Sequence, residues 1–149
     1  MIERKDKILK NVNLKDHKGL EIGALDRPIV KANQGNIKYA DHLSTSDLVA
    51  KYKDDKNVDT AKIVDVDFIL EGNSLAKSIG RENKFNYVIA SHVIEHVPDV
   101  IGWLKDISEI LYDGGILSLA IPDKRFTFDY LRTPTTCGDL IEAHMQNIS

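Results

Sequence analysis

The sequence has little of what disulfide-bonded or membrane-spanning proteins need. Cys137 is the only cysteine among 149 residues, so no disulfide can form within the chain. The apolar runs are short, as at residues 116–121, against the roughly 20 residues of a membrane helix. Residues 1–7 are charged and no apolar stretch follows them, as a secretory signal would require. We therefore expect a cytoplasmic protein that makes no contact with a membrane.

The chain also lacks an excess of positive charge. Lys and Arg number 20 and Asp and Glu number 23, which gives a net charge of −3. Such a balance offers no basic surface for nucleic-acid phosphates, so we expect no nucleic-acid partner. With 42% hydrophobic and 29% charged residues, the composition is that of an ordinary globular protein. We expect one domain over residues 1–149, with an N-terminal helical segment (1–18), a core (19–122) and a late loop and helix (123–149).

Strand and helix patterns alternate along the chain. Short apolar or β-branched runs predict strands at 19–22, 36–40, 62–66, 87–91 and 116–121. Helical patterns lie at 1–15, 46–52, 75–79, 99–111 and 138–146. This alternation predicts an α/β fold, a doubly wound and mostly parallel sheet with helices on both faces. Ligands of such sheets bind at the carboxyl ends of the strands.

Local signals mark the ends of two of these helices. Ser46 is a capping residue at the start of the second helix. Pro98 and Asp99 mark the start of the helix at 99–111, and the turn Asp113-Gly-Gly marks its end. Trp103 lies at a helical spacing that predicts packing on the sheet.

The first two strands end in a pair of residues suited to a nucleoside. Gly23 follows the first strand, and Asp41 follows the second, 18 positions later. A glycine lets a ligand approach the backbone, and a carboxylate can accept hydrogen bonds from both ribose hydroxyls. By spacing alone, a turn glycine and an ordinary surface aspartate explain the pair equally well.

Longer segments carry a specific resemblance. Leu20-Glu-Ile-Gly-Ala, Ala90-Ser-His-Val-Ile-Glu-His and Gly115-Ile-Leu-Ser-Leu-Ala-Ile-Pro-Asp occur in this order. Over residues 19–140 the chain resembles class I S-adenosylmethionine-dependent methyltransferases, especially a bacterial type 11-like group. The resemblance implies a Rossmann-like fold, S-adenosylmethionine as cofactor and methyl transfer to an acceptor. We expect that acceptor to be a small molecule or a sugar.

The resemblance also implies site residues. Asp41 matches the residue that holds the ribose, and either Asp67 or Glu71 would flank the adenine. Ser91 and His92 match the wall that faces the methyl group. His92 and His96 are the candidate bases for an acceptor that must lose a proton, although a loop contact and a helix cap explain them as well. The remaining matches are Glu21, Gly23 and Ala24 after the first strand and, toward the acceptor, the loop from Asp123 to Asp129.

Two departures from the family pattern have consequences. Leu25 and Arg27 stand where the family usually has glycine, and Pro28 and Gly35 predict an extended loop in place of a first helix. The 27 residues after Pro122 are too few for the two late strands of the family. We therefore expect a sheet that ends on its fifth strand, whose exposed edge favours self-association. A non-catalytic domain that keeps the fold as a binding module is the alternative function.

Two other enzyme classes fit single motifs only. The stretch from His92 to His96 reads H-x-x-E-H, a zinc-hydrolase pattern, but Pro98 leaves room for little more than one helical turn. A nicotinamide dehydrogenase would need glycine where Leu25 and Pro28 stand. Neither class is favoured, and no metal is expected.

Overall fold

The computed structural model describes residues 3–72, 74–128 and 130–146 of the chain. Their strands form one sheet in the order β3-β2-β1-β4-β5, and every pairing is parallel. The strands are β1 (Lys18–Ile22), β2 (Asn36–Asp41), β3 (Phe68–Ile69), β4 (Phe85–Ser91) and β5 (Leu111–Ala120). The order reverses between β1 and β4, which is the switch point of a doubly wound sheet. The predicted α/β class is confirmed.

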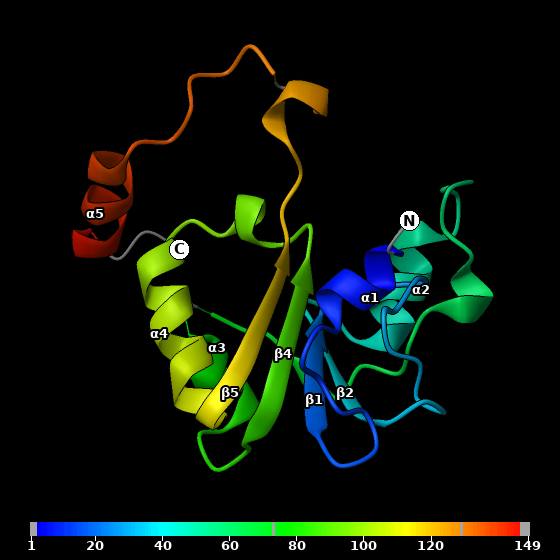
Figure 1. Ribbon diagram of the computed structural model, residues 1–149. Coiled ribbons are helices and arrows are strands. Elements are labelled where there is room, and N and C mark those ends of the chain that lie inside the picture. The colour runs from blue at the N-terminus through cyan, green and yellow to red at the C-terminus, as the bar shows by residue number, and fades with distance from the viewer. Residues whose placement is uncertain (1–2, 73, 129, 147–149) are drawn as a thin grey trace.

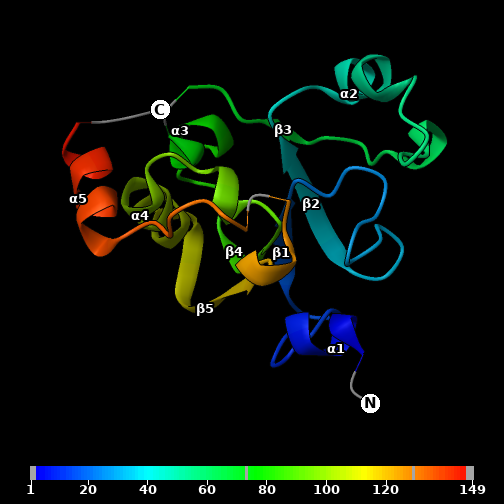
Figure 2. The same ribbon diagram turned by 90° about the horizontal axis from the view of Figure 1, so that it is seen from above.

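Helices lie on both faces of this sheet. They are α1 (Arg4–Ile8), α2 (Thr45–Tyr52), α3 (Leu75–Ile79), α4 (Val100–Ile110) and α5 (Cys137–Met145), with 3-10 turns η1 (Thr60–Lys62), η2 (Ile94–His96) and η3 (Lys124–Phe126). Figure 1 and Figure 2 show α3 and α4 on one face and α1 on the other, with α5 outside α4. α3 coincides with the predicted helix.

Each face of the sheet has its own apolar core. On the side of α3 and α4, the buried side chains include Leu20, Val88, Ala76, Ile107 and Ile110. On the side of α1, they include Ile8, Val30, Tyr39, Tyr87 and Ile89. Alternate residues of β4 therefore serve opposite cores, and both faces of this central strand are buried.

One predicted strand is wrong. Residues 62–66 form no strand: η1 ends at Lys62, and β3 begins only at Phe68. The backbone between them is satisfied elsewhere, because Val64 N–H donates to Leu25 O and Val66 N–H donates to the Thr45 hydroxyl. Polar partners from other segments thus replace the sheet ladder, and β-branched residues alone did not specify a strand here.

Three helix boundaries also differ from the prediction. α1 is only five residues long: it ends at Ile8, and Asn11 has φ +66°, a left-handed conformation that a continuing helix does not contain. The cap of α2 is Ser44, which accepts a hydrogen bond from Asp47 N–H, and not Ser46. α4 ends at Ile110, and Leu111 already belongs to β5. Asp113-Gly-Gly is therefore an irregularity in the strand, where Gly114 has φ +77° and the register with β4 shifts.

The late part of the chain leaves β5 at the edge of the sheet. No strand follows it in residues 121–128 and 130–146, as predicted. The chain instead crosses to α5, where His144 Nδ1 lies 2.9 Å from Asp99 Oδ2 and Nε2 lies 2.8 Å from Lys105 Nζ. Among the described residues, no helix has the length and apolarity to cross a membrane.

Candidate functional site

A cavity of about 670 Å³ opens at the carboxyl ends of the strands, where the fold predicts a ligand. The ends of β1 and β2 and the loop after β4 form its floor. Residues of α2, α3 and α4 form its walls. Its lining includes Gly23, Asp41, His42, Lys51, Leu70, Gly72, His92, Val93, His96, Asp99 and Trp103.

Gly23 holds the turn directly after β1. Its φ of +70° lies in the left-handed region, and its N–H donates to Ala40 O at 3.0 Å. A Cβ at this position would lie 3.1 Å from Cγ2 of Val93, which also lines the cavity. Glycine therefore keeps both the turn and the space above it open.

Leu25, which stands where the sequence departs from the glycine-rich pattern, has a left-handed backbone conformation. Leu25 has φ +47°, a conformation that costs a residue with a Cβ roughly 1–2 kcal/mol. Arg27, at the other departure, donates to Asn57 O at 2.9 Å. The backbone at Leu25 thus has the left-handed conformation that glycine usually adopts, although the residue is a leucine.

Asp41 faces the cavity with one carboxylate oxygen already engaged. Its residue surface is 8% exposed, and Oδ1 accepts hydrogen bonds from His42 N–H at 2.8 Å and from the His42 ring Nδ1 at 2.6 Å. Lys51 Nζ lies 2.9 Å from the other ring nitrogen, so the neutral ring carries its proton on Nδ1. Oδ2 accepts no hydrogen bond within the described part of the chain.

Glu21 lies on the other face of the sheet and does not line the cavity. It is 2% exposed, and its carboxylate accepts hydrogen bonds from Ile29 N–H at 2.7 Å and Val30 N–H at 3.1 Å. Burial raises the pKa of Glu21, and the two N–H groups oppose that rise. Glu21 fixes the loop that stands in place of a first helix, so it reaches the cavity only through the position of that loop.

The two candidates for the adenine differ in their surroundings. Both oxygens of Asp67 are taken, one by Lys38 Nζ at 2.6 Å and the other by Tyr39 N–H at 2.9 Å, and Asp67 lines a separate hollow beside β2. Glu71 is exposed between Leu70 and Gly72, which both line the cavity. Asp67 therefore lies away from the cavity, whereas the residues on either side of Glu71 line it.

The end of β4 brings two of the predicted residues to the cavity. His92 and His96 line it, whereas Ser91 and Ala24 do not. His92 has φ +57°, and its Nδ1 lies 3.5 Å from Glu95 Oε1. The Ser91 hydroxyl instead accepts a hydrogen bond from Arg4 at 2.6 Å. Left-handed backbone at a non-glycine residue beside a cavity is typical of functional positions.

Several cavity residues were missed by the sequence reading. Lys51 and Tyr52 come from the end of α2, and Ser78, Trp103 and Asp106 come from α3 and α4. Trp103 packs on the core as predicted and also lines the cavity. Helix spacing identifies an apolar face, but it gives no signal for which end of that face borders a ligand site.

The loop after β5 is only partly described. Asp123 forms a charge pair with Arg125 at 2.6 Å, and Asp129 lies outside the described residues. Neither Asp123 nor η3 lines the cavity. In the described part of the chain, no three His, Cys, Asp or Glu side chains gather as a metal site would require.

A doubly wound sheet with an acidic residue and a glycine turn facing its switch-point cavity defines a nucleotide-type ligand site. A family model described as a methyltransferase domain matches residues 5–148. The chain belongs to this methyltransferase domain family, and the resemblance to class I S-adenosylmethionine-dependent methyltransferases is confirmed. None of the curated proteins compared with the chain matches it.

A solved structure shows the same fold. It is the crystal structure of the selenomethionine-substituted CurJ carbon methyltransferase, similar to this chain with a TM-score of 0.51 and 16% identity. The match covers 94% of this chain and 35% of that chain, so this chain spans about a third of the neighbour's length. At this identity the likeness concerns the fold alone.

Proposed function

We propose that this chain binds S-adenosylmethionine in the cavity at the ends of β1, β2 and β4 and transfers its methyl group to a small molecule or a sugar. The observation that carries the proposal is Asp41, a nearly buried carboxylate that lines the cavity and whose Oδ2 accepts no hydrogen bond from the described residues. A ribose hydroxyl is the kind of donor that this oxygen lacks. The cavity volume of about 670 Å³ lies in the usual range for small-molecule sites.

The protein's part in this chemistry is positioning. The bound sulfonium supplies an already activated methyl group. Gly23 lets the ligand lie close to the backbone, and Asp41 fixes the ribose. In-line displacement then requires the acceptor atom at about 3–3.5 Å from the methyl, which the walls of the cavity and the end of β4 must enforce.

An acceptor that carries a proton needs a base, and His92 is placed to serve. The Glu95 carboxylate beside Nδ1 favours a proton on that nitrogen, which leaves Nε2 free to accept one. His92 lines the cavity and its side chain is half exposed, so an acceptor can reach it from solvent. His96 lies one turn further on and is a second candidate.

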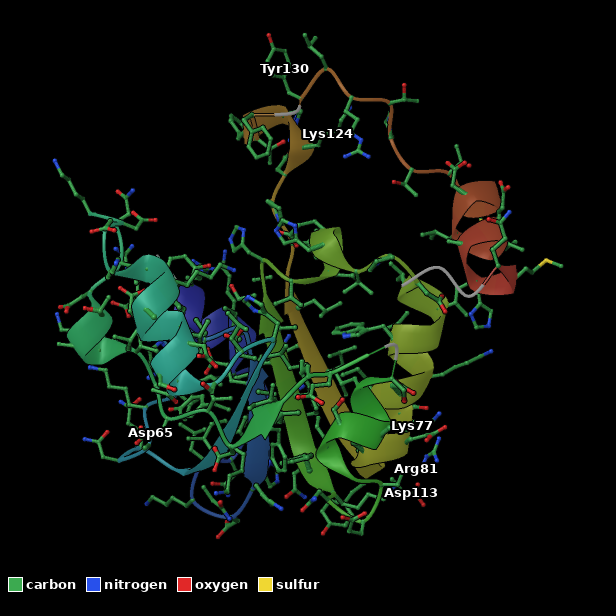
Figure 3. All side chains as sticks on the ribbon, turned by 180° about the vertical axis from the view of Figure 1, so that it is seen from behind. Asp65, Lys77, Arg81, Asp113, Lys124 and Tyr130 are labelled. Atoms are coloured by element: carbon green, nitrogen blue, oxygen red, sulfur yellow. The ribbon has the colours of Figure 1, made fainter. Side chains whose placement is uncertain are left out.

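The test is calorimetric titration with S-adenosylmethionine and S-adenosylhomocysteine, comparing the natural chain with Asp41→Asn. The amide oxygen of the variant can still accept from His42, but a donating NH₂ group then takes the place of the accepting Oδ2. We expect affinity to fall about 10- to 100-fold, the loss of a hydrogen bond to a charged group. Asp113→Asn removes the same charge at the opposite end of the sheet (Figure 3) and should leave affinity unchanged.

The outcome separates the two functions considered for this fold. Saturable binding that Asp41→Asn weakens supports the methyltransferase proposal. A folded chain that binds neither compound contradicts it and favours a non-catalytic binding module. Equal affinity of the natural chain and of Asp41→Asn would mean that the ligand binds elsewhere.

A further inference from the structure

The short helix α1 is held firmly on the body of the protein. Ile8 is 6% exposed in the core below the sheet, and the Ser118 hydroxyl of β5 donates to Ile8 O at 2.6 Å. Lys5 Nζ donates to the Gln34 side chain at 2.8 Å. These contacts join α1 to β5 and to the loop before β2, so the side chains of α1 have defined positions.

Arg4 uses this placement to reach the end of β4. Its Nη2 donates to the Ser91 hydroxyl at 2.6 Å, although 87 positions separate the two residues. Ser91 is the last residue of β4, and the next residue, His92, lines the cavity. Figure 1 shows α1 beside the upper end of β4. Neither Arg4 nor Ser91 lines the cavity, but the bond to Ser91 holds the guanidinium at the carboxyl end of β4, one residue before His92, which does line it.

The charge of Arg4 has no acidic partner in the part of the chain that the structure describes. Among the described residues, no carboxylate lies within ion-pair distance of Arg4, whereas Arg27, Arg81 and Arg125 each have an acidic partner. A guanidinium has five N–H donors, and the hydrogen bond to Ser91 uses one of them. The side chain is exposed. The planar fork that remains is suited to a carboxylate or a phosphate.

From this geometry we infer that Arg4 binds an anionic group of the acceptor, which is therefore a small acid with a carboxylate or a phosphate. The inference rests on the proposed methyl transfer and narrows its substrate class. Anchoring the acceptor by its charged group orients the nucleophilic atom over the end of β4, which in-line transfer demands. The bond to Ser91 holds the guanidinium in place and lowers the entropy lost when the anion binds.

The experiment measures small probes on the chain saturated with S-adenosylhomocysteine. Phenylacetate is compared with phenylacetamide, and glucose 6-phosphate with glucose, by saturation-transfer NMR titration. We expect each acid to bind at least about tenfold more tightly than its neutral counterpart. Arg4→Gln should abolish that preference, and Arg4→Lys should keep part of it. Lys7→Gln removes the same charge from an exposed position of α1 and should leave the preference intact.

The two pairs also separate the sources of the anion. A larger preference for phenylacetate over its amide assigns a carboxylate as the natural group. A larger preference for glucose 6-phosphate over glucose assigns a phosphate. Equal binding of acids and neutral probes overturns the inference, as does a preference that survives in Arg4→Gln. If S-adenosylhomocysteine binds and no acid is preferred, only this inference fails. If S-adenosylhomocysteine does not bind to the folded chain, the proposed function fails and this inference falls with it.

Discussion

Two tyrosines and a glutamate form a buried polar group beneath the sheet, away from the cavity. Tyr39 donates from its hydroxyl to Val30 O at 2.6 Å, whereas the Tyr87 hydroxyl has no partner among the described residues. Burial, together with the nearby charge of Glu21, raises the pKa of each tyrosine to about 12. Both hydroxyls therefore keep their protons. The two residues differ in that only the Tyr39 hydroxyl donates its proton in a hydrogen bond.

This difference predicts opposite effects of the same substitution. Tyr87→Phe removes an unsatisfied buried hydroxyl and should raise the free energy of unfolding by about 1 kcal/mol. Tyr39→Phe is the matched control, because it leaves Val30 O without its donor and should lower that free energy by about 1 kcal/mol. Urea unfolding of the three chains measures both changes. A Tyr87→Phe chain that is clearly less stable would show that the hydroxyl has a partner.

Glu21 gives a prediction about pH. Burial raises its pKa above the ordinary 4.5, so the native state favours the protonated form more than the unfolded chain does. The stability from this preference is fully present below about pH 4.5 and is lost as pH rises through the native pKa. Relative to Glu21→Gln, whose side chain does not titrate, the natural chain should therefore lose stability as pH rises from 4 toward neutrality. Urea unfolding of both chains across this range tests the sign, and a natural chain that gains stability relative to Glu21→Gln as pH rises would refute it.

At the scale of elements, α5 is attached by side chains and not by a core. None of its described residues is buried, and its last turn meets α4 through His144, which lies between Asp99 and Lys105. Burial raises the pKa of Asp99, but hydrogen bonds from Gly102 N–H and His144 outweigh it, and the pKa is lowered overall. Asp99 thus caps α4, lines the cavity and holds α5 at once.

His144→Ala should therefore loosen α5 without unfolding the domain. We expect amide exchange in α5 to speed up about fivefold, which corresponds to roughly 1 kcal/mol, while the sheet is unaffected. Glu142→Ala changes an exposed residue of the same helix and serves as the control. Hydrogen exchange read by mass spectrometry resolves both segments. Unchanged exchange in α5 would mean that other contacts hold it.

The strands and helices also show how much of the fold could be predicted from the sequence. The strands β1, β2 and β4 and the helices α3 and α4 have apolar patterns bounded by polar residues, and these local signals placed them within a residue or two. Residues 62–66 had the β-branched composition of a strand, but their backbone bonds to Leu25 and Thr45, which lie far away in sequence. Composition cannot reveal such distant partners.

The candidate site likewise contains residues that the sequence placed correctly and residues that it did not. Gly23, Asp41, His92 and His96 follow strands, and strand ends meet at one edge of a parallel sheet, so sequence order sufficed to bring them to the cavity. Glu21 also ends a strand, but the side-chain alternation of β1 turns it to the other face. The partner of Ser91 could not be foreseen, because Arg4 reaches it only through the packing of α1.

At the scale of the whole molecule, the sheet formed by the described residues ends on β5, which has a partner strand on one side only. Within the described residues β5 pairs with β4 on one side only, and the segment beyond it exposes large apolar side chains, Ile121 at 59%, Phe126 at 86% and Phe128 fully. Unpaired edges and open apolar patches are the usual sites at which a second copy adds. We propose that two copies of this chain associate through β5.

Sedimentation velocity from micromolar to millimolar concentrations should then show a monomer–dimer equilibrium. Ile121→Lys places a charge directly after β5, where a paired edge would have to bury it, and should shift the equilibrium toward monomer. Phe128→Lys adds the same charge further along the chain at a fully exposed residue, so the dimer should persist if the strand edge forms the contact. Loss of the dimer in Phe128→Lys alone would assign the interface to the exposed aromatic residues after β5. A monomer at every concentration would contradict pairing through β5 altogether.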